Sequence, residues 1–190
     1  MTTIAIPEWN TLGVLPPIDP TQPTSAERSP YPVALLDVVM RFATSAERRR
    51  VLHGFLDYRA ALREIGLANG FQWLDGSFME HVEVLERRAP RDIDVVTFVE
   101  IPDDFTPSDE QMALIEHDAA KEKFAVDSYF VELNLLAPQA IVATSAYWYS
   151  MWSHRRNQAW KGYLQVDLTP DQDQEARDWL TQLDAKEVTP

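Results

Sequence analysis

The sequence contains no cysteine and only four histidines, and each shortage excludes a class of site. Without cysteine there is no disulfide framework, no thiolate zinc site and no cysteine nucleophile. No two histidines are three or four residues apart, so one helix face cannot bring a pair of imidazoles to a metal. A histidine metal site is therefore not expected, and we interpret these as surface or core residues: His53, His81, His117 and His154.

Basic residues are also scarce. Lys and Arg number 17 against 30 Asp and Glu, which gives a net charge of −13. Non-specific binding to nucleic acid or to an anionic membrane needs clustered positive charge, so the composition argues against both partners. A locally basic cleft remains compatible with this balance.

The sequence has no segment typical of a secreted or membrane protein. The first nine residues lack the basic and apolar segments of a signal peptide. Residues 133–153 carry no formal charge, but they include Asn134, Pro138 and Gln139, which favours a buried helix over a membrane span. We therefore expect a soluble, cytoplasmic protein.

The pattern of proline and apolar residues predicts an arm and one domain. Residues 1–32 hold seven of the 13 prolines, which predicts an extended arm rather than sheet or helix, and Trp9 and Leu15 indicate that the arm lies against the body. Residues 33–190 are expected to form a single α/β or α+β domain, a small mixed sheet flanked by helices. The predicted helices cover 33–67, 78–88, 108–123, 138–154 and a C-terminal segment, and the predicted strands cover 71–74, 91–99, 124–131 and 162–168.

The stretch "RDIDVV", residues 91–96, is an unusual strand because it carries two aspartates on one face. Carboxylates are depleted from strands, and a buried ionised carboxylate costs several kcal/mol unless it is compensated. A divalent cation would compensate Asp92 and Asp94, and Mg²⁺ prefers such oxygen ligands. Asp127 lies in another short apolar segment and can supply a third carboxylate if the two strands are neighbours.

Gly76 and Ser77 follow a predicted strand and precede a predicted helix. Backbone N–H groups, the helix dipole and the hydroxyl at such a turn make an anion site that suits phosphates. A glycine at a strand-to-helix turn is also ordinary, and solvated aspartates on an edge strand would explain residues 92–94. The ordered combination carries more information than either motif alone.

In that order, "LDGSF", "RDIDVV" and "FAVDSYF" resemble the nucleotidyltransferase superfamily of DNA polymerase beta type. The resemblance covers residues 70–132 and implies a nucleotidyltransferase-like core. "GVLPPI" and "SHRRNQAWKGYLQVDL" are similar to segments of short bacterial proteins that have this core.

The resemblance implies a role for each matching residue. Gly76 and Ser77 would hold the triphosphate of an NTP, and Asp92 and Asp94 would bind two Mg²⁺ ions, or Mn²⁺ in their place. Asp127 would share the catalytic ion and help to activate a hydroxyl of an acceptor, which is a protein side chain, an RNA end or a small molecule. The products would be the nucleotidylated acceptor and pyrophosphate.

Other interpretations of these residues remain open. Arg155, Arg156 and Lys161 either approach the nucleotide phosphates or form a solvated turn, and the three arginines Arg48–Arg50 are expected on a solvated face. The protein could also be a catalytically silent nucleotide-binding or partner-docking module, or a structural subunit. By analogy with small relatives of such superfamilies, it could work with a protein partner in a toxin–antitoxin or phage-defence pair.

Overall fold

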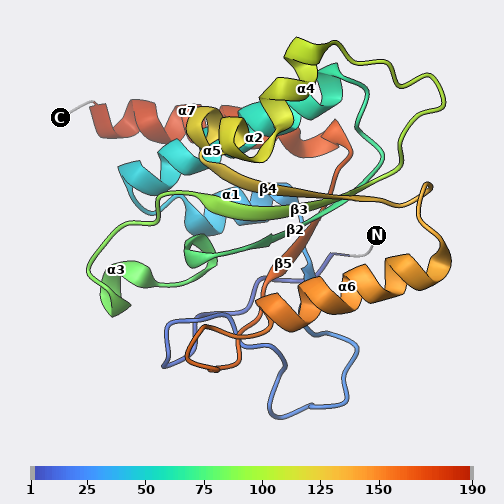
Figure 1. The fold of residues 1–190 in the computed structure, drawn as a ribbon. Helices are drawn as coiled ribbons and strands as arrows, with labels where there is room; N and C mark the ends of the chain where they lie inside the picture. Colours follow the sequence, from blue (N-terminus) through green and yellow to red (C-terminus); the bar gives the residue numbers. More distant parts are fainter. Residues whose placement is uncertain (1–2, 189–190) are drawn as a thin grey trace.

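A five-stranded mixed sheet organises the chain in the computed structural model, which describes residues 3–188 (Figure 1). The strand order is β1-β5-β2-β3-β4, and helices lie on both sides of the sheet. The predicted class, a small mixed sheet flanked by helices, is confirmed. The strands are β1 (Tyr31–Pro32), β2 (Gly70–Asp75), β3 (Ile93–Val99), β4 (Val126–Glu132) and β5 (Leu164–Asp167).

The directions of the three central strands bring distant parts of the sequence to one edge of the sheet. β2 runs antiparallel to β3 and to β5, whereas β3 and β4 run parallel. A parallel pair needs a long crossover, and residues 100–125 supply it with two helices. The carboxyl end of β2 therefore lies beside the amino ends of β3 and β4.

Seven α-helices lie within residues 3–188. Figure 1 shows α1, α2, α5 and α7 on one side of the sheet and α6 on the other. Two hydrophobic clusters match this division: the larger contains Leu74 and Val95, and the smaller contains Val96, Trp148 and Trp152. The helices are α1 (Leu35–Phe42), α2 (Ala46–Glu64), α3 (Val82–Leu85), α4 (Asp109–Ile115), α5 (His117–Phe124), α6 (Pro138–Trp152) and α7 (Asp173–Val188).

Short-range chemistry explains where several helices begin. Ser45 caps α2, and its side chain accepts a hydrogen bond from the backbone of Arg48. Ser108 and Gln111 form a capping box at the start of α4. Pro138 opens α6 at its first turn, where a missing backbone donor costs nothing.

The predicted helix over 78–88 is wrong, and a buried arginine explains why. Residues 77–79 form a single 3-10 turn, and only residues 82–85 are α-helical. Arg48 is fully buried and donates hydrogen bonds to the carbonyl oxygens of Phe78 and Glu80, at 2.7 Å each. Those carbonyls would otherwise serve a continuous helix. The expectation that Arg48–Arg50 form a solvated face is likewise wrong for Arg48 and Arg49, which are both buried.

The N-terminal segment is partly sheet, contrary to the expectation for residues 1–32. The backbone N–H of Tyr31 donates to Tyr163, so that β1 pairs with β5 at the edge of the sheet, where proline is tolerated. Leu15 is buried in the larger core, and the indole N–H of Trp9 donates to the carbonyl of Met79 at 2.7 Å. The segment therefore contacts the turn that follows β2.

α6 is more exposed than the prediction of a buried helix suggested. Trp148 and Trp152 pack under it on the sheet, whereas Val142 and Tyr147 are 69% and 58% exposed. Across the described part of the chain, none of the helices combines the length and apolar character that a membrane span needs.

Candidate functional site

Three aspartates form a row across the central strands. Asp75 at the end of β2 is the Cα partner of Asp94 in β3, and Asp94 is the Cα partner of Asp127 in β4. Neighbouring strands are about 4.8 Å apart, and residues in register project to the same face. Asp92 precedes Asp94 by two residues and shares its face. The convergence expected for Asp92, Asp94 and Asp127 thus follows directly from strand register.

A cleft of about 680 Å³ opens over this row of carboxylates. Six acidic and five basic side chains line it, so it is nearly neutral in a chain of net charge −13. All of the site residues predicted from the sequence line this one cleft: Gly76, Ser77, Asp92, Asp94, Asp127, Arg155, Arg156 and Lys161.

Asp94 is the carboxylate of the row that lacks compensation. Within residues 3–188 it makes no hydrogen bond or ion pair, although its side chain is mostly buried. Burial, together with the charges of Asp75, Asp127 and Asp92, raises the pKa of Asp94 to about 7, against the lowering effect of Lys161. A positive charge placed beside Asp94 would therefore be strongly favoured.

Lys121, on α5, bridges two of the other carboxylates. Its ammonium nitrogen lies 2.7 Å from Oδ2 of Asp127 and 3.1 Å from Oδ2 of Asp92. The other oxygen of Asp127, Oδ1, lies 3.1 Å from Nδ1 of His117. Neither Lys121 nor His117 was predicted as a site residue. The ammonium of Lys121 thus already neutralises part of the charge of Asp92 and Asp127.

Lys161 forms a second ion pair at the base of the cleft. Its ammonium lies 2.8 Å from Asp75 and 3.3 Å from Glu80, and all three side chains are buried. Burial raises the pKa of Asp75 to about 6, against the lowering effect of Lys161. The ammonium of Lys161, which the sequence analysis placed near the nucleotide phosphates, is therefore already paired with two carboxylates of the protein.

The other two predicted basic residues, Arg155 and Arg156, differ in whether they are already paired with acids of the protein. Arg155 contacts Glu80 at 3.1 Å and Glu86 at 2.8 Å. Arg156 is exposed and makes no ion pair or hydrogen bond in the part of the chain that the structure describes. Of the two, Arg156 is the one available to a ligand.

The backbone at Gly76 passes directly beside Asp94. Gly76 has a φ of +83°, and a Cβ at this position would stand 2.5 Å from Oδ2 of Asp94. Only glycine allows both this conformation and this approach. The following 3-10 turn is too short to supply the helix dipole that the sequence predicted, so anion binding at Gly76 and Ser77 would depend on the backbone and the hydroxyl.

The sequence reasoning missed three residues that shape the cleft. Asp75 stood within the quoted "LDGSF" motif, and pairing this strand with residues 91–99 would have revealed it. Arg48 holds residues 78–80 in place and also binds the carboxylate of Glu83. Lys121 reaches the acids only because α5 packs against β4, and no local pattern signals that contact.

The chemistry of these residues fits a hard divalent cation, although no metal cage is formed as the side chains stand. Throughout residues 3–188, no three His, Asp or Glu side chains are placed to hold one ion. Lys121 is a stand-in cation between Asp92 and Asp127, and Asp94 lacks a counter-charge beside them. An oxygen-only donor set of this kind is the type that Mg²⁺ prefers.

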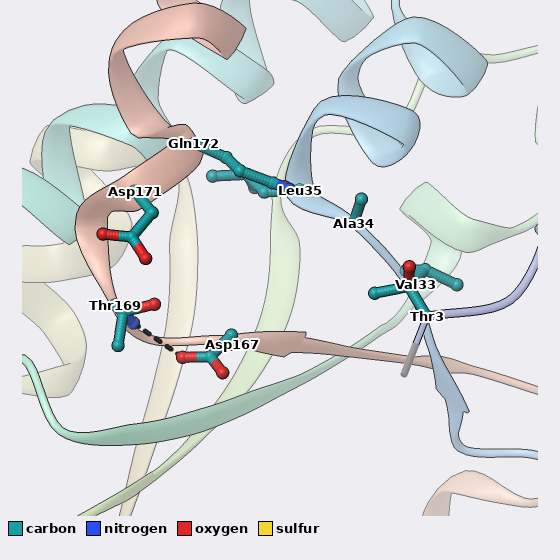
Figure 2. Close-up of a pocket in the computed structure, with 8 residues that line it drawn as sticks. All are labelled: Thr3, Val33, Ala34, Leu35, Asp167, Thr169, Asp171 and Gln172. Carbon is teal, nitrogen blue, oxygen red and sulfur yellow. Dashed lines mark hydrogen bonds between the residues drawn. The ribbon is translucent and has the colours of Figure 1, made fainter. Parts of the chain in front are cut away.

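A smaller pocket lies between the start of α1 and residues 167–172 (Figure 2). Asp167 there accepts a hydrogen bond from the backbone of Thr169, and Gln172 accepts one from the backbone of Leu36. Its lining contains two aspartates and no basic side chain. The pocket therefore suits phosphates poorly, and the carboxylate cleft is the stronger candidate.

Comparison with known proteins gives a family but no characterised relative. Neither the curated proteins nor the solved structures contain a match to this sequence. Residues 7–167, which include the whole lining of the carboxylate cleft, match the family described as "Family of unknown function (DUF6932)". Because the match spans most of the 190 residues, the chain belongs to the DUF6932 family.

Proposed function

We propose that the protein is a Mg²⁺-dependent nucleotidyltransferase, which transfers a nucleoside monophosphate from an NTP to a hydroxyl group. The observation that carries this proposal is the register of β3 and β4, which sets Asp94 against Asp127 with Asp92 beside them. The cleft above these acids also contains the Gly76–Ser77 turn. The resemblance of the three motifs to the polymerase beta superfamily agrees with this arrangement.

Asp92, Asp94 and Asp127 would hold the metal ions. When bound, two such ions stabilise the charge on the attacking and leaving oxygens of an in-line displacement. The acceptor hydroxyl would attack the α-phosphorus, its proton would pass to a carboxylate oxygen of Asp127, and pyrophosphate would leave. Oδ1 of Asp127 is buried beside Nδ1 of His117, at 3.1 Å, and Oδ2 contacts Lys121 at 2.7 Å, so Oδ2 would take that proton once Lys121 has moved away.

The triphosphate would lie along the turn and the basic wall of the cleft. Gly76 lets the backbone approach the carboxylates closely, and Ser77 supplies a hydroxyl. Arg156 makes no ion pair within residues 3–188 and can bind a phosphate directly. Arg155 and Lys161 already pair with Glu80 and Asp75, so each would contact a phosphate only in addition to its acid. This distribution makes Arg156 the main phosphate contact among the three.

One assay tests the proposal directly. The protein is incubated with NTPs labelled at the α-phosphate, Mg²⁺ or Mn²⁺, and a cell extract as the source of acceptor. Label should enter protein, RNA or a small molecule, and the double variant Asp92→Ala with Asp94→Ala should lose this transfer. The matched control, Asp103→Ala with Asp104→Ala, removes two exposed acids away from the cleft and should keep it.

A second candidate is a nucleotide-binding or partner-docking module without turnover. The observation that favours it is Lys121, which already neutralises Asp92 and Asp127. In the same assay this module would retain a labelled nucleotide without transferring its α-phosphate. The absence of any nucleotide binding would contradict the enzyme and the nucleotide-binding form of this module, and would leave only partner docking.

A further inference from the structure

The two lysines of the cleft differ in how firmly they are held. Lys161 is 7% exposed and lies between Asp75 and Glu80, which are themselves buried. Lys121 is 44% exposed and reaches Asp92 and Asp127 from the surface of α5. Moving Lys161 away would leave Asp75 and Glu80 buried without a counter-charge. Lys121 can move into solvent by rotation of its own side chain.

The position of Lys121 is one that a divalent cation would also need. Its ammonium contacts Oδ2 of Asp92 and Oδ2 of Asp127, the two acids that flank Asp94 on the same face of the sheet. A single positive charge is bound there among three carboxylates. A divalent ion would bring a second charge and would reach Asp94, which Lys121 does not contact.

Resting on the proposed function, we infer that Lys121 is an exchangeable counter-ion that competes with the metal. In the metal-free protein its ammonium holds Asp92 and Asp127 together. Metal binding displaces it toward solvent, because the ammonium and a divalent ion repel each other and compete for Oδ2 of Asp92 and Oδ2 of Asp127. Lys121 thereby lowers the affinity for metal and keeps the row of acids from repelling one another when no metal is present.

The test is a Mn²⁺ titration of the full chain without nucleotide, with free Mn²⁺ followed by its electron paramagnetic resonance signal. Lys121→Met should bind Mn²⁺ about tenfold more tightly than the wild type, since two partly buried ion pairs no longer oppose the ion. Lys123→Met is the matched control. Lys123 lies on the same helix, is exposed and contacts the ring of Phe124 rather than the acids, so its loss should leave the affinity unchanged.

A thermal melt keeps the test decisive if Lys121→Met folds poorly. In EDTA, Lys121→Met and the polar variant Lys121→Gln should both melt below the wild type, because the acids then lack a cation. Added Mn²⁺ should raise their Tm by more than it raises that of the wild type or of Lys123→Met.

Two results would overturn the inference, and only the second would also contradict the metal site of the proposed function. If Lys121→Met binds Mn²⁺ as the wild type does, or more weakly, Lys121 is no competitor, while the metal site of the proposed function stands. If neither protein binds Mn²⁺, the inference and the metal site fall together.

Discussion

Asp94 and Asp127 are Cα partners on the parallel strands β3 and β4, and they present two carboxylates to one face of the sheet. Asp75 continues the row on β2, and Lys121 and Lys161 neutralise the two outer members. The middle acid, Asp94, keeps a raised pKa of about 7 because burial and three neighbouring acids oppose its charge. The charges of the two outer aspartates are therefore neutralised by lysines, whereas the ionised form of Asp94 is unfavourable.

We expect Asp94→Asn to stabilise the metal-free protein at alkaline pH. Asp94 binds its proton more tightly in the folded state, at a pKa of about 7, than at its ordinary value of 3.8. As the pH rises from about 4 to about 7, the wild type therefore loses stability that the asparagine variant keeps, roughly 2–4 kcal/mol.

Urea denaturation in EDTA at several pH values measures this difference. The variant should be more stable than the wild type above pH 7, and the two should converge toward pH 4. A difference that is the same at every pH would show that Asp94 does not titrate in this range.

A Cβ at position 76 should disrupt the site more than it disrupts the fold. In Gly76→Ala the new carbon would stand 2.5 Å from Oδ2 of Asp94, and the positive φ adds backbone strain of about 1 kcal/mol. Gly66→Ala is the matched control, because Gly66 also has a positive φ, of +94°, and the nearest atom to its Cβ is 4.0 Å away.

Both alanine variants should lose a similar amount of stability in urea denaturation, with a modest further loss for Gly76→Ala. Mn²⁺ binding should be lost in Gly76→Ala alone. Equal Mn²⁺ binding by the two variants would show that the approach of Gly76 to Asp94 does not matter for the metal.

Lys161→Met should be strongly destabilising. The substitution leaves Asp75 and Glu80 buried without their cation, and breaking a buried ion pair in this way costs about 3–5 kcal/mol. Lys186→Met, at an exposed position of α7, should change the free energy of unfolding by less than about 0.5 kcal/mol. Adding Asp75→Asn to Lys161→Met should restore part of the loss, and a failure to do so would argue that Lys161 stabilises the fold through packing alone.

Arg48→Met should loosen the turn that follows β2. Arg48 is fully buried and binds two backbone carbonyls of residues 78 and 80 as well as Glu83, so we expect a loss of about 3–5 kcal/mol. Arg50→Met removes an exposed arginine from the same triplet and should be nearly neutral. Hydrogen exchange of residues 77–85 should rise in the first variant only. Unchanged exchange there would mean that Arg48 does not position this turn.

Strand periodicity was enough to place Asp92 and Asp94 on one face. The alternation of residues 91–99 predicted which side Asp92 and Asp94 share, and the apolar segment around Asp127 predicted a second strand. Parallel pairing in register could not be read from either segment, because it depends on how α4 and α5 carry the chain from β3 to β4. The shared face of Asp92 and Asp94 was therefore predictable from their own strand, whereas their meeting with Asp127 was not.

Two of the failures share one physical cause, which is long-range contact by charged side chains. Arg48 binds the carbonyls of residues 78 and 80 from 30 or more positions away and so replaces a predicted helix with a turn. Lys121 meets Asp92 only after two helices pack on the sheet. Local propensity contains no information on either contact.

The central claim is that Asp92, Asp94 and Asp127 share a divalent cation beside Gly76, and crystallography with Mn²⁺ and a non-hydrolysable NTP analogue tests it most directly. The account predicts an anomalous Mn²⁺ peak within about 2.3 Å of oxygens from these three aspartates, the triphosphate beside the Gly76–Ser77 turn, and the Lys121 ammonium turned away. A peak elsewhere, or no peak with Lys121 still bound to Asp92 and Asp127, would contradict it.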